Sequence, residues 1–267
     1  MTRRFRLAAL AVSLVGFVSA SGLGVRAEER PAHRPVAAKV GRPLTAPPEL
    51  VALVDTLRKA ALAGDREALF ALVADDVTFV TSGLTATVGR RAEKRSFAPD
   101  RGDEALEAIG LAFTEGEPAA PSGRSFDFRD ARIATALARI AEETKAPDWA
   151  SDPLVPGGWC THPGASWDAK AAEQAGLTGR AVFVTAPTEA RAKPETGARA
   201  VARLTSDRLW ALAESDETGG WTHVALPDGR TAWLPPGAAK SAQPWGFCFL
   251  PNVAGGWLLS AVISALN

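Results

Sequence analysis

The chain has 267 residues, and its 30 lysines and arginines are balanced by 30 aspartates and glutamates. A nucleic-acid-binding protein normally carries a basic excess or a basic stripe, and this sequence shows neither. Attraction of a cationic protein to an anionic membrane surface has little support for the same reason.

The N-terminus has the three parts of a secretory signal peptide. Residues 3–6 include three arginines, residues 7–18 are almost wholly apolar, and small-residue cleavage signals end at Ala20 and Ala27. The apolar run is shorter than the roughly 20 residues that a membrane-spanning helix needs, although an uncleaved helical anchor is the alternative. We therefore expect residues 1–27 to be a signal peptide. The mature protein is then periplasmic or secreted and has no membrane span, and the sequence leaves its oligomeric state open.

The first part of the mature chain is expected to be a tether followed by helices. Residues 28–48 contain five prolines and no apolar period, which predicts an extended, flexible tether. Apolar residues at helical spacing predict a helix from Glu49 to Gly64, and Asp65 is placed to cap a second one. Later expected elements are a strand at 77–80 and helices at 103–113 and 129–143. These elements make up an expected mainly helical domain, residues 49–148.

The composition changes near residues 146–148, and all eight tryptophans follow, from Trp149 to Trp257. The second half has short apolar or alternating runs separated by glycine and proline, a pattern typical of a small barrel or sandwich. Asp228-Gly229 predicts a tight hairpin turn between two of these strands. The expected strands are residues 181–184, 200–204, 209–213, 221–226, 231–234, 247–250 and 257–263.

Residues 220–235 resemble the end of bacterial SH3-like (SH3b) domains. In those domains a Gly-Trp pair, an alternating strand, a polar-Gly turn and a Gly-Trp-Val strand recur, and here Ala232 replaces the second glycine. Residues 186–194 are similar to the opening of the family, with Ala190 in place of a valine and Lys193 in place of a glycine. The resemblance implies an SH3-like β-barrel with extra strands over residues 149–267, and hence an α+β protein.

A wider resemblance covers most of the mature chain. Uncharacterised exported Gram-negative proteins have a helical segment like residues 63–77, an SH3-like domain, and a terminal strand like residues 255–259. That resemblance implies an architecture and no activity. The opening helices also resemble SnoaL-like proteins, which would imply a small-ligand pocket in the helical domain.

The two cysteines, Cys160 and Cys248, are expected to form a disulfide, because an exported chain folds in an oxidising compartment. Two buried thiols are one alternative. Another is an envelope thiol hydrolase in which Cys160 acts with His162 or His223. The histidines have no carboxylates at ligand spacing, so no metal site and no cofactor is expected.

The tryptophans divide into two expected roles. Large residues at alternating strand positions fill a small barrel, so we interpret Trp221, Trp233 and Trp257 as barrel core. Tryptophans in loops can stack on sugar rings or dock a peptide, and packing is the alternative. The tryptophans expected in loops, and hence the candidate binding residues, are Trp149, Trp159, Trp167 and Trp245. The sequence thus favours a non-catalytic binding protein of the periplasm or cell envelope, with peptidoglycan or an envelope protein as partner.

Overall fold

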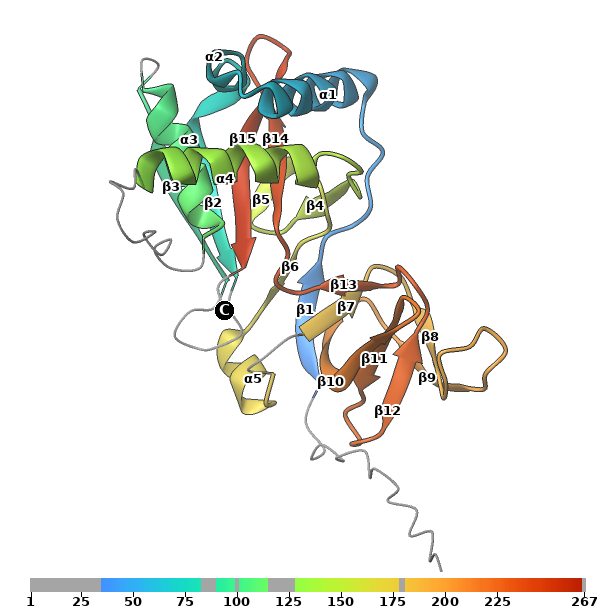
Figure 1. The fold of residues 1–267 in the computed structure, drawn as a ribbon. Coiled ribbons are helices and arrows are strands. Elements are labelled where there is room, and N and C mark those ends of the chain that lie inside the picture. Colours follow the sequence, from blue (N-terminus) through green and yellow to red (C-terminus); the bar gives the residue numbers. More distant parts are fainter. Residues whose placement is uncertain (1–34, 83–89, 99–100, 115–127, 178–180, 266–267) are drawn as a thin grey trace, which may run out of the picture.

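The computed structural model describes residues 35–82, 90–98, 101–114, 128–177 and 181–265. The expected signal peptide and the first part of the expected tether lie outside these ranges. Helices occupy the N-terminal part, and two β-sheets complete the fold, one of them a curled antiparallel half-barrel (Figure 1). Within the described ranges, no helix has both the length and the apolar character needed to cross a membrane.

Four helices form where the helical periodicity predicts them. Gly64 ends the first in the left-handed region, with φ of 69°. The Asp65 side chain caps the second by accepting a hydrogen bond from the Ala68 backbone N–H (3.0 Å). Arg101 occupies the cap position of the third, and Asp103, where the predicted helix begins, lies inside its first turn, where a negative charge suits the helix dipole. These helices are α1 (Pro48–Ala63), α2 (Arg66–Phe70), α3 (Gly102–Ala112) and α4 (Phe128–Glu143).

The first sheet combines strands from the N-terminal part of the described chain with strands from its C-terminal part. Its six strands lie in the order β3-β2-β15-β14-β5-β4, and β15 runs parallel to β2 (Figure 1). We expected the strands after residue 148 to belong to the barrel, but β4, β5, β14 and β15 pair instead into the sheet that contains β2. The change in composition near residue 148 therefore does not separate the two sheets. The strands are β2 (Val73–Ser82), β3 (Arg90–Ser96), β4 (Ala150–Asp152), β5 (Val155–Cys160), β14 (Gly246–Pro251) and β15 (Trp257–Ala265).

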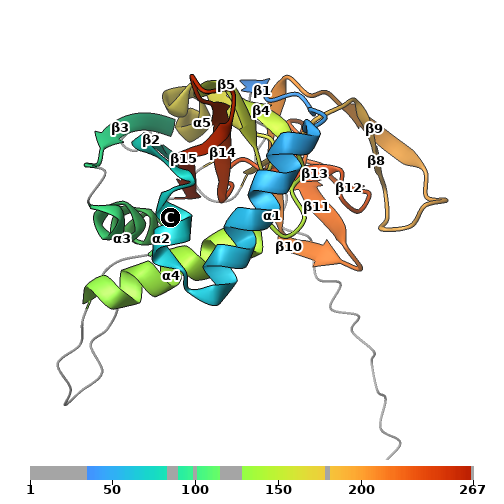
Figure 2. The ribbon, with the colours of Figure 1, turned by 90° about the horizontal axis from the view of Figure 1, so that it is seen from above.

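Helices α1, α3 and α4 cover one face of this sheet (Figures 1 and 2). Side chains alternate across a strand, so Phe247 and Phe249 of β14 point toward the helices while Cys248 points to the opposite face. On the helix side the two phenylalanines pack with Leu106 and Ile133, and all four side chains are fully buried. This cluster, which we call the main core, is the largest of the four hydrophobic clusters in the described residues.

The second sheet has nine strands, and most of them form the half-barrel in the order β13-β7-β10-β11-β12-β8-β9. The predicted Asp-Gly hairpin is present between β11 and β12, with Gly229 at φ of 86°. Alternate residues, including Val224, Ala232 and Leu234, fill the interior. The strands are β7 (Ala181–Val184), β8 (Thr188–Arg191), β9 (Ala200–Leu204), β10 (Arg208–Thr218), β11 (Trp221–Ala225), β12 (Thr231–Leu234) and β13 (Ala239–Ser241).

Part of the expected tether is a strand that belongs to this sheet. In β1 (Val36–Val40), Val36 is 2% exposed and lies opposite Leu209 of β10. The chain then crosses to the first sheet, where the Leu44 N–H donates to the Trp149 carbonyl (2.8 Å). A segment with these backbone partners links the two sheets, so the description as a flexible tether is not correct from Val36 onward. Together with β1, strand β6 (Ala165–Trp167) and helix α5 (Ala169–Gln174) form a layer over one end of the half-barrel's outer face.

Candidate functional site

Three tryptophans come together at one end of the six-stranded sheet. In β5, Trp159 lies opposite Phe249 of β14. The Trp149 ring meets the Phe249 ring edge to face (5.9 Å between centroids), and the Trp257 ring meets the Trp159 ring in the same way (5.0 Å). We refer to Trp149, Trp159 and Trp257 as the aromatic cluster. Two of its members were predicted as binding residues, and the structure adds Trp257.

The aromatic cluster lies at the border of the main core. Each of its side chains packs against buried residues of that core but remains partly exposed. Leu53 of α1, also partly buried, packs against the same core. The three rings therefore pack against the main core on one side and remain partly accessible on the other.

Two further features shape this end of the sheet. The indole N–H of Trp159 is buried and has no hydrogen-bond acceptor among the described residues. The turn that leads into Trp257 is closed by Asn252, whose Oδ1 accepts hydrogen bonds from the N–H groups of Ala254 (3.0 Å) and Gly256 (2.8 Å). This turn fixes the entry of β15, and the side chain of Val253 at its tip is fully exposed.

The other two predicted binding tryptophans do not join the aromatic cluster. Trp245 stacks on Phe113 (5.2 Å between centroids), and the Arg139 guanidinium lies 4.7 Å from the Trp245 ring centroid. Trp167 belongs to β6 and packs on the layer that covers the half-barrel. Both side chains act in packing between elements, which was the alternative to binding.

The tryptophans assigned to the barrel core are distributed differently from the prediction. Trp221 is buried, but Trp233 lies on the outer face because Ala232 and Leu234 occupy the interior positions of β12. Trp257 is in the other sheet. The interior contains Trp210 instead, which is 6% exposed. Trp210 lies within the apolar run 209–213 that was predicted to be a strand, so the sequence did contain a signal for a buried tryptophan there.

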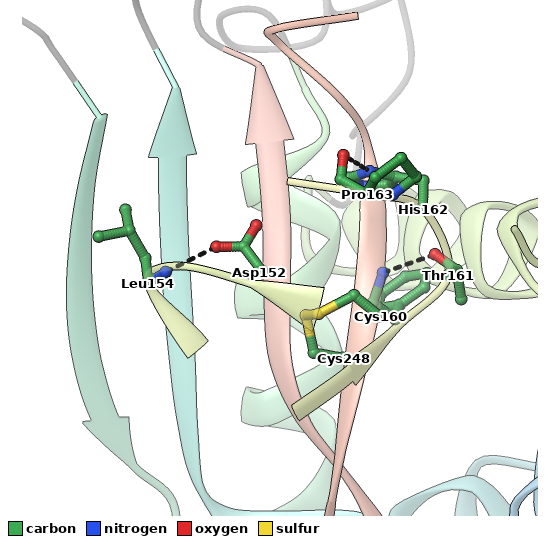
Figure 3. Close-up of a disulfide and its surroundings, with 8 residues drawn as sticks. Asp152, Leu154, Cys160, Thr161, His162, Pro163 and Cys248 are labelled. Carbon is green, nitrogen blue, oxygen red and sulfur yellow. Dashed lines mark hydrogen bonds between the residues drawn. A yellow bond between two sulfur atoms is a disulfide. The ribbon is translucent and has the colours of Figure 1, made fainter. Parts of the chain in front are cut away.

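The predicted disulfide is present between Cys160 and Cys248 (Figure 3). The two residues are direct neighbours on β5 and β14, and neither is exposed. A disulfide-bonded sulfur is not a thiolate, so Cys160 in this state cannot act as the nucleophile of a hydrolase. The two candidate partners are also separated: His162 Nδ1 lies 2.9 Å from the Pro163 carbonyl near the disulfide, whereas His223 is on the half-barrel.

A surface groove of about 430 Å³ lies between the first turns of α2, α3 and α4. Its cations are matched by carboxylates: Arg66 pairs with Asp103 (3.5 Å) and with Asp130 (3.1 Å), and Arg101 pairs with Glu104 (3.3 Å). An open groove with compensated charges does not resemble the enclosed pocket that a SnoaL-like reading implies. Across the described residues, no group of three or more His, Cys, Asp and Glu side chains is placed to hold a metal ion.

No protein-family model matches the chain, and no curated protein and no solved structure matches it either. The functional interpretation therefore depends on the geometry of the described residues. Among them the aromatic cluster is the best candidate site, because it combines partly exposed rings with a firmly packed base.

Proposed function

We propose that this chain is an exported, non-catalytic SH3-like binding protein of the periplasm or cell envelope, and that the aromatic cluster contacts its ligand. The observation that carries the proposal is the contact between Trp159 and Trp257 beside Trp149, with all three rings partly exposed. The N-terminal sequence supports export, and the disulfide is consistent with an oxidising compartment. The curled half-barrel and its β11–β12 hairpin, which carries the SH3b-like residues, support the SH3-like assignment.

Peptidoglycan is the ligand that we favour. A tryptophan ring offers a large flat apolar face, and such faces contribute strongly to recognition when a ligand covers them. The polymer also supplies many hydrogen-bond acceptors. Its sugar rings can stack on the partly exposed faces of the three tryptophans.

Co-sedimentation with isolated peptidoglycan tests this proposal. We expect saturable binding by the oxidised mature protein. Trp257→Ala should weaken it by roughly tenfold or more, since a central aromatic contact is worth about 2 kcal/mol. Trp257 is suited to the test because it begins a strand and is only partly buried, so the rest of the core stays in place.

Trp245→Phe is the matched control, because it changes a tryptophan outside the aromatic cluster and keeps an aromatic ring beside Phe113. This variant should bind like the wild type. Failure of the folded wild type to sediment with peptidoglycan, or unchanged binding by a folded Trp257→Ala variant, would refute the proposal.

A further inference from the structure

The outer face of the half-barrel carries a second set of partly exposed rings, in a different sheet from the aromatic cluster. Strands β8, β12 and β11 lie side by side (Figure 1), and their register places Arg191 opposite Trp233 and Trp233 opposite His223. Ala190, Ala232 and Val224 point inward and are fully buried. Because side chains alternate, Arg191, Trp233 and His223 form one row on the outside, which we call the outer row.

The rings of the outer row are ordered by their own contact. The Trp233 and His223 rings are nearly parallel, with an interplanar angle of 8° and 4.2 Å between centroids. The Arg191 guanidinium is held in place by the Ala198 carbonyl (2.7 Å) and by Glu189 (3.4 Å). Its side chain is 25% exposed. Two of the five N–H donors of an arginine are used by these contacts, which leaves donors for a further acceptor.

β1, β6 and α5 cover one end of this face, and the outward residues beneath them, including Phe183, Ala211 and Ala225, are buried. The Trp233 ring lies outside this covered part: it is partly exposed and is not among the hydrophobic side chains that pack against the buried clusters of the described residues. A partly exposed tryptophan outside these clusters is suited to contact with a ligand.

The charge beside the outer row is basic, although the chain as a whole is neutral. The hairpin of β8 and β9 projects from the half-barrel (Figures 1 and 2), and residues 188–204 contain four basic and two acidic side chains. Arg203 is exposed and lies opposite Glu189, the carboxylate that also contacts Arg191. Two arginines and one carboxylate therefore lie near one another at this edge of the row.

We propose that the outer row binds an acidic peptide in an extended conformation. Apolar side chains of the peptide would contact Trp233 and His223, and its carboxylates would meet Arg191 and Arg203. Successive side chains of an extended chain point to opposite sides, so the residues that contact the rings and the cations are alternate residues, about 7 Å apart, on one side of the peptide. Charge-assisted hydrogen bonds from arginine to carboxylate supply the specificity. This site is separate from the aromatic cluster and does not depend on the function proposed for it.

The test uses the oxidised mature protein and two acetylated, amidated hexapeptides, one with two leucines followed by four glutamates, which places leucine and glutamate on the same side of an extended chain, and one in which glutamine replaces glutamate. NMR titration follows the indole N–H of Trp233, whose signal is assigned with Trp233→Phe. We expect saturable shifts, with the glutamate peptide binding at least fivefold more tightly and losing affinity as salt rises. Arg203→Gln should remove most of the difference between the peptides without disturbing the fold, since this side chain is exposed.

Lys170→Gln is the control for charge, because it removes one exposed cation from α5. It should bind both peptides like the wild type. The proposal is overturned if the Trp233 signal does not shift, if the two peptides bind equally, or if Lys170→Gln weakens binding as much as Arg203→Gln. Peptidoglycan sedimentation by Arg203→Gln should remain at the wild-type level, which separates this site from the aromatic cluster.

Discussion

Replacing Gly110 by alanine sets two effects of opposite sign against each other. Gly110 lies inside α3, and alanine in a helix interior is favoured over glycine by about 1 kcal/mol. A Cβ at this position would lie 1.8 Å from the backbone carbonyl oxygen of Arg132 in α4. A backbone atom cannot rotate away, so the two helices must separate, and such overpacking costs about 3 kcal/mol. The steric effect wins, and Gly110→Ala should lower the free energy of unfolding by about 2 kcal/mol.

Urea unfolding followed by circular dichroism measures this change. The control is Ala134→Gly at an exposed position in the interior of α4, where helix propensity alone should cost about 1 kcal/mol. Because Ile109 and Ile133 adjoin the crossing and are fully buried, separation of the helices would also loosen the main core. A Gly110→Ala variant that is as stable as the wild type, or more stable, would refute the close crossing of α3 and α4.

Two further predictions concern the disulfide and a half-buried carboxyl group. The double variant Cys160→Ala/Cys248→Ala removes a bond between residues 88 apart in sequence, so the free energy of unfolding should fall by about 4.5 kcal/mol. Urea unfolding measures this change, and a fall of less than about 1 kcal/mol would contradict the loop-closure argument. Burial raises the pKa of Glu143 above its ordinary value, against the opposing effect of Arg139. The folded state therefore disfavours the ionised form, and stability is lost as the pH rises through the raised pKa. Glu143→Gln should be more stable than the wild type at pH 7 and not at pH 3.5, and thermal unfolding at both values checks the sign.

The features predicted correctly from the sequence depend on residues that are close together in the chain. The four helices are set by apolar periodicity, by the Asp65 cap and by the glycine at position 64. The β11–β12 hairpin is set by its Asp-Gly turn and by the alternation of the strands on either side. In each case the signal lies within about a dozen residues, so no knowledge of distant contacts is needed.

The features that were missed depend on pairings between distant segments. β15 runs parallel to β2, a contact between segments more than 170 residues apart in sequence, and no local pattern indicates it. β3 is almost wholly charged and exposed because it is an edge strand, so it lacks the apolar alternation that would reveal it. The assignment of Trp233 to the interior failed for another reason. Alternation gives two faces, and the sequence alone did not show that Ala232 and Leu234 occupy the inner one.

The candidate site was predicted in part, since Trp149 and Trp159 were named from their glycine- and proline-rich surroundings. Their partner Trp257 was not, because it reaches them only through the β14–β15 hairpin. Trp245 had the same kind of local surroundings but stacks on Phe113. Local composition singled out these tryptophans as candidates for binding. Whether each one lies on a contact surface or packs against another element depends on the tertiary structure.

The disulfide and the aromatic cluster depend on the same two strands. Cys160 and Cys248 are paired across β5 and β14, and the adjacent pair in that ladder is Trp159 and Phe249, whose rings point to the opposite face. Shifting a strand by one residue would move every side chain to the other face of the sheet. A covalent bond between directly opposed residues forbids that shift, so it fixes Trp159 on the face where it meets Trp257. Most of the half-barrel lies between the two cysteines in sequence, and the bond therefore holds the base of the aromatic cluster in register even when the half-barrel moves or unfolds.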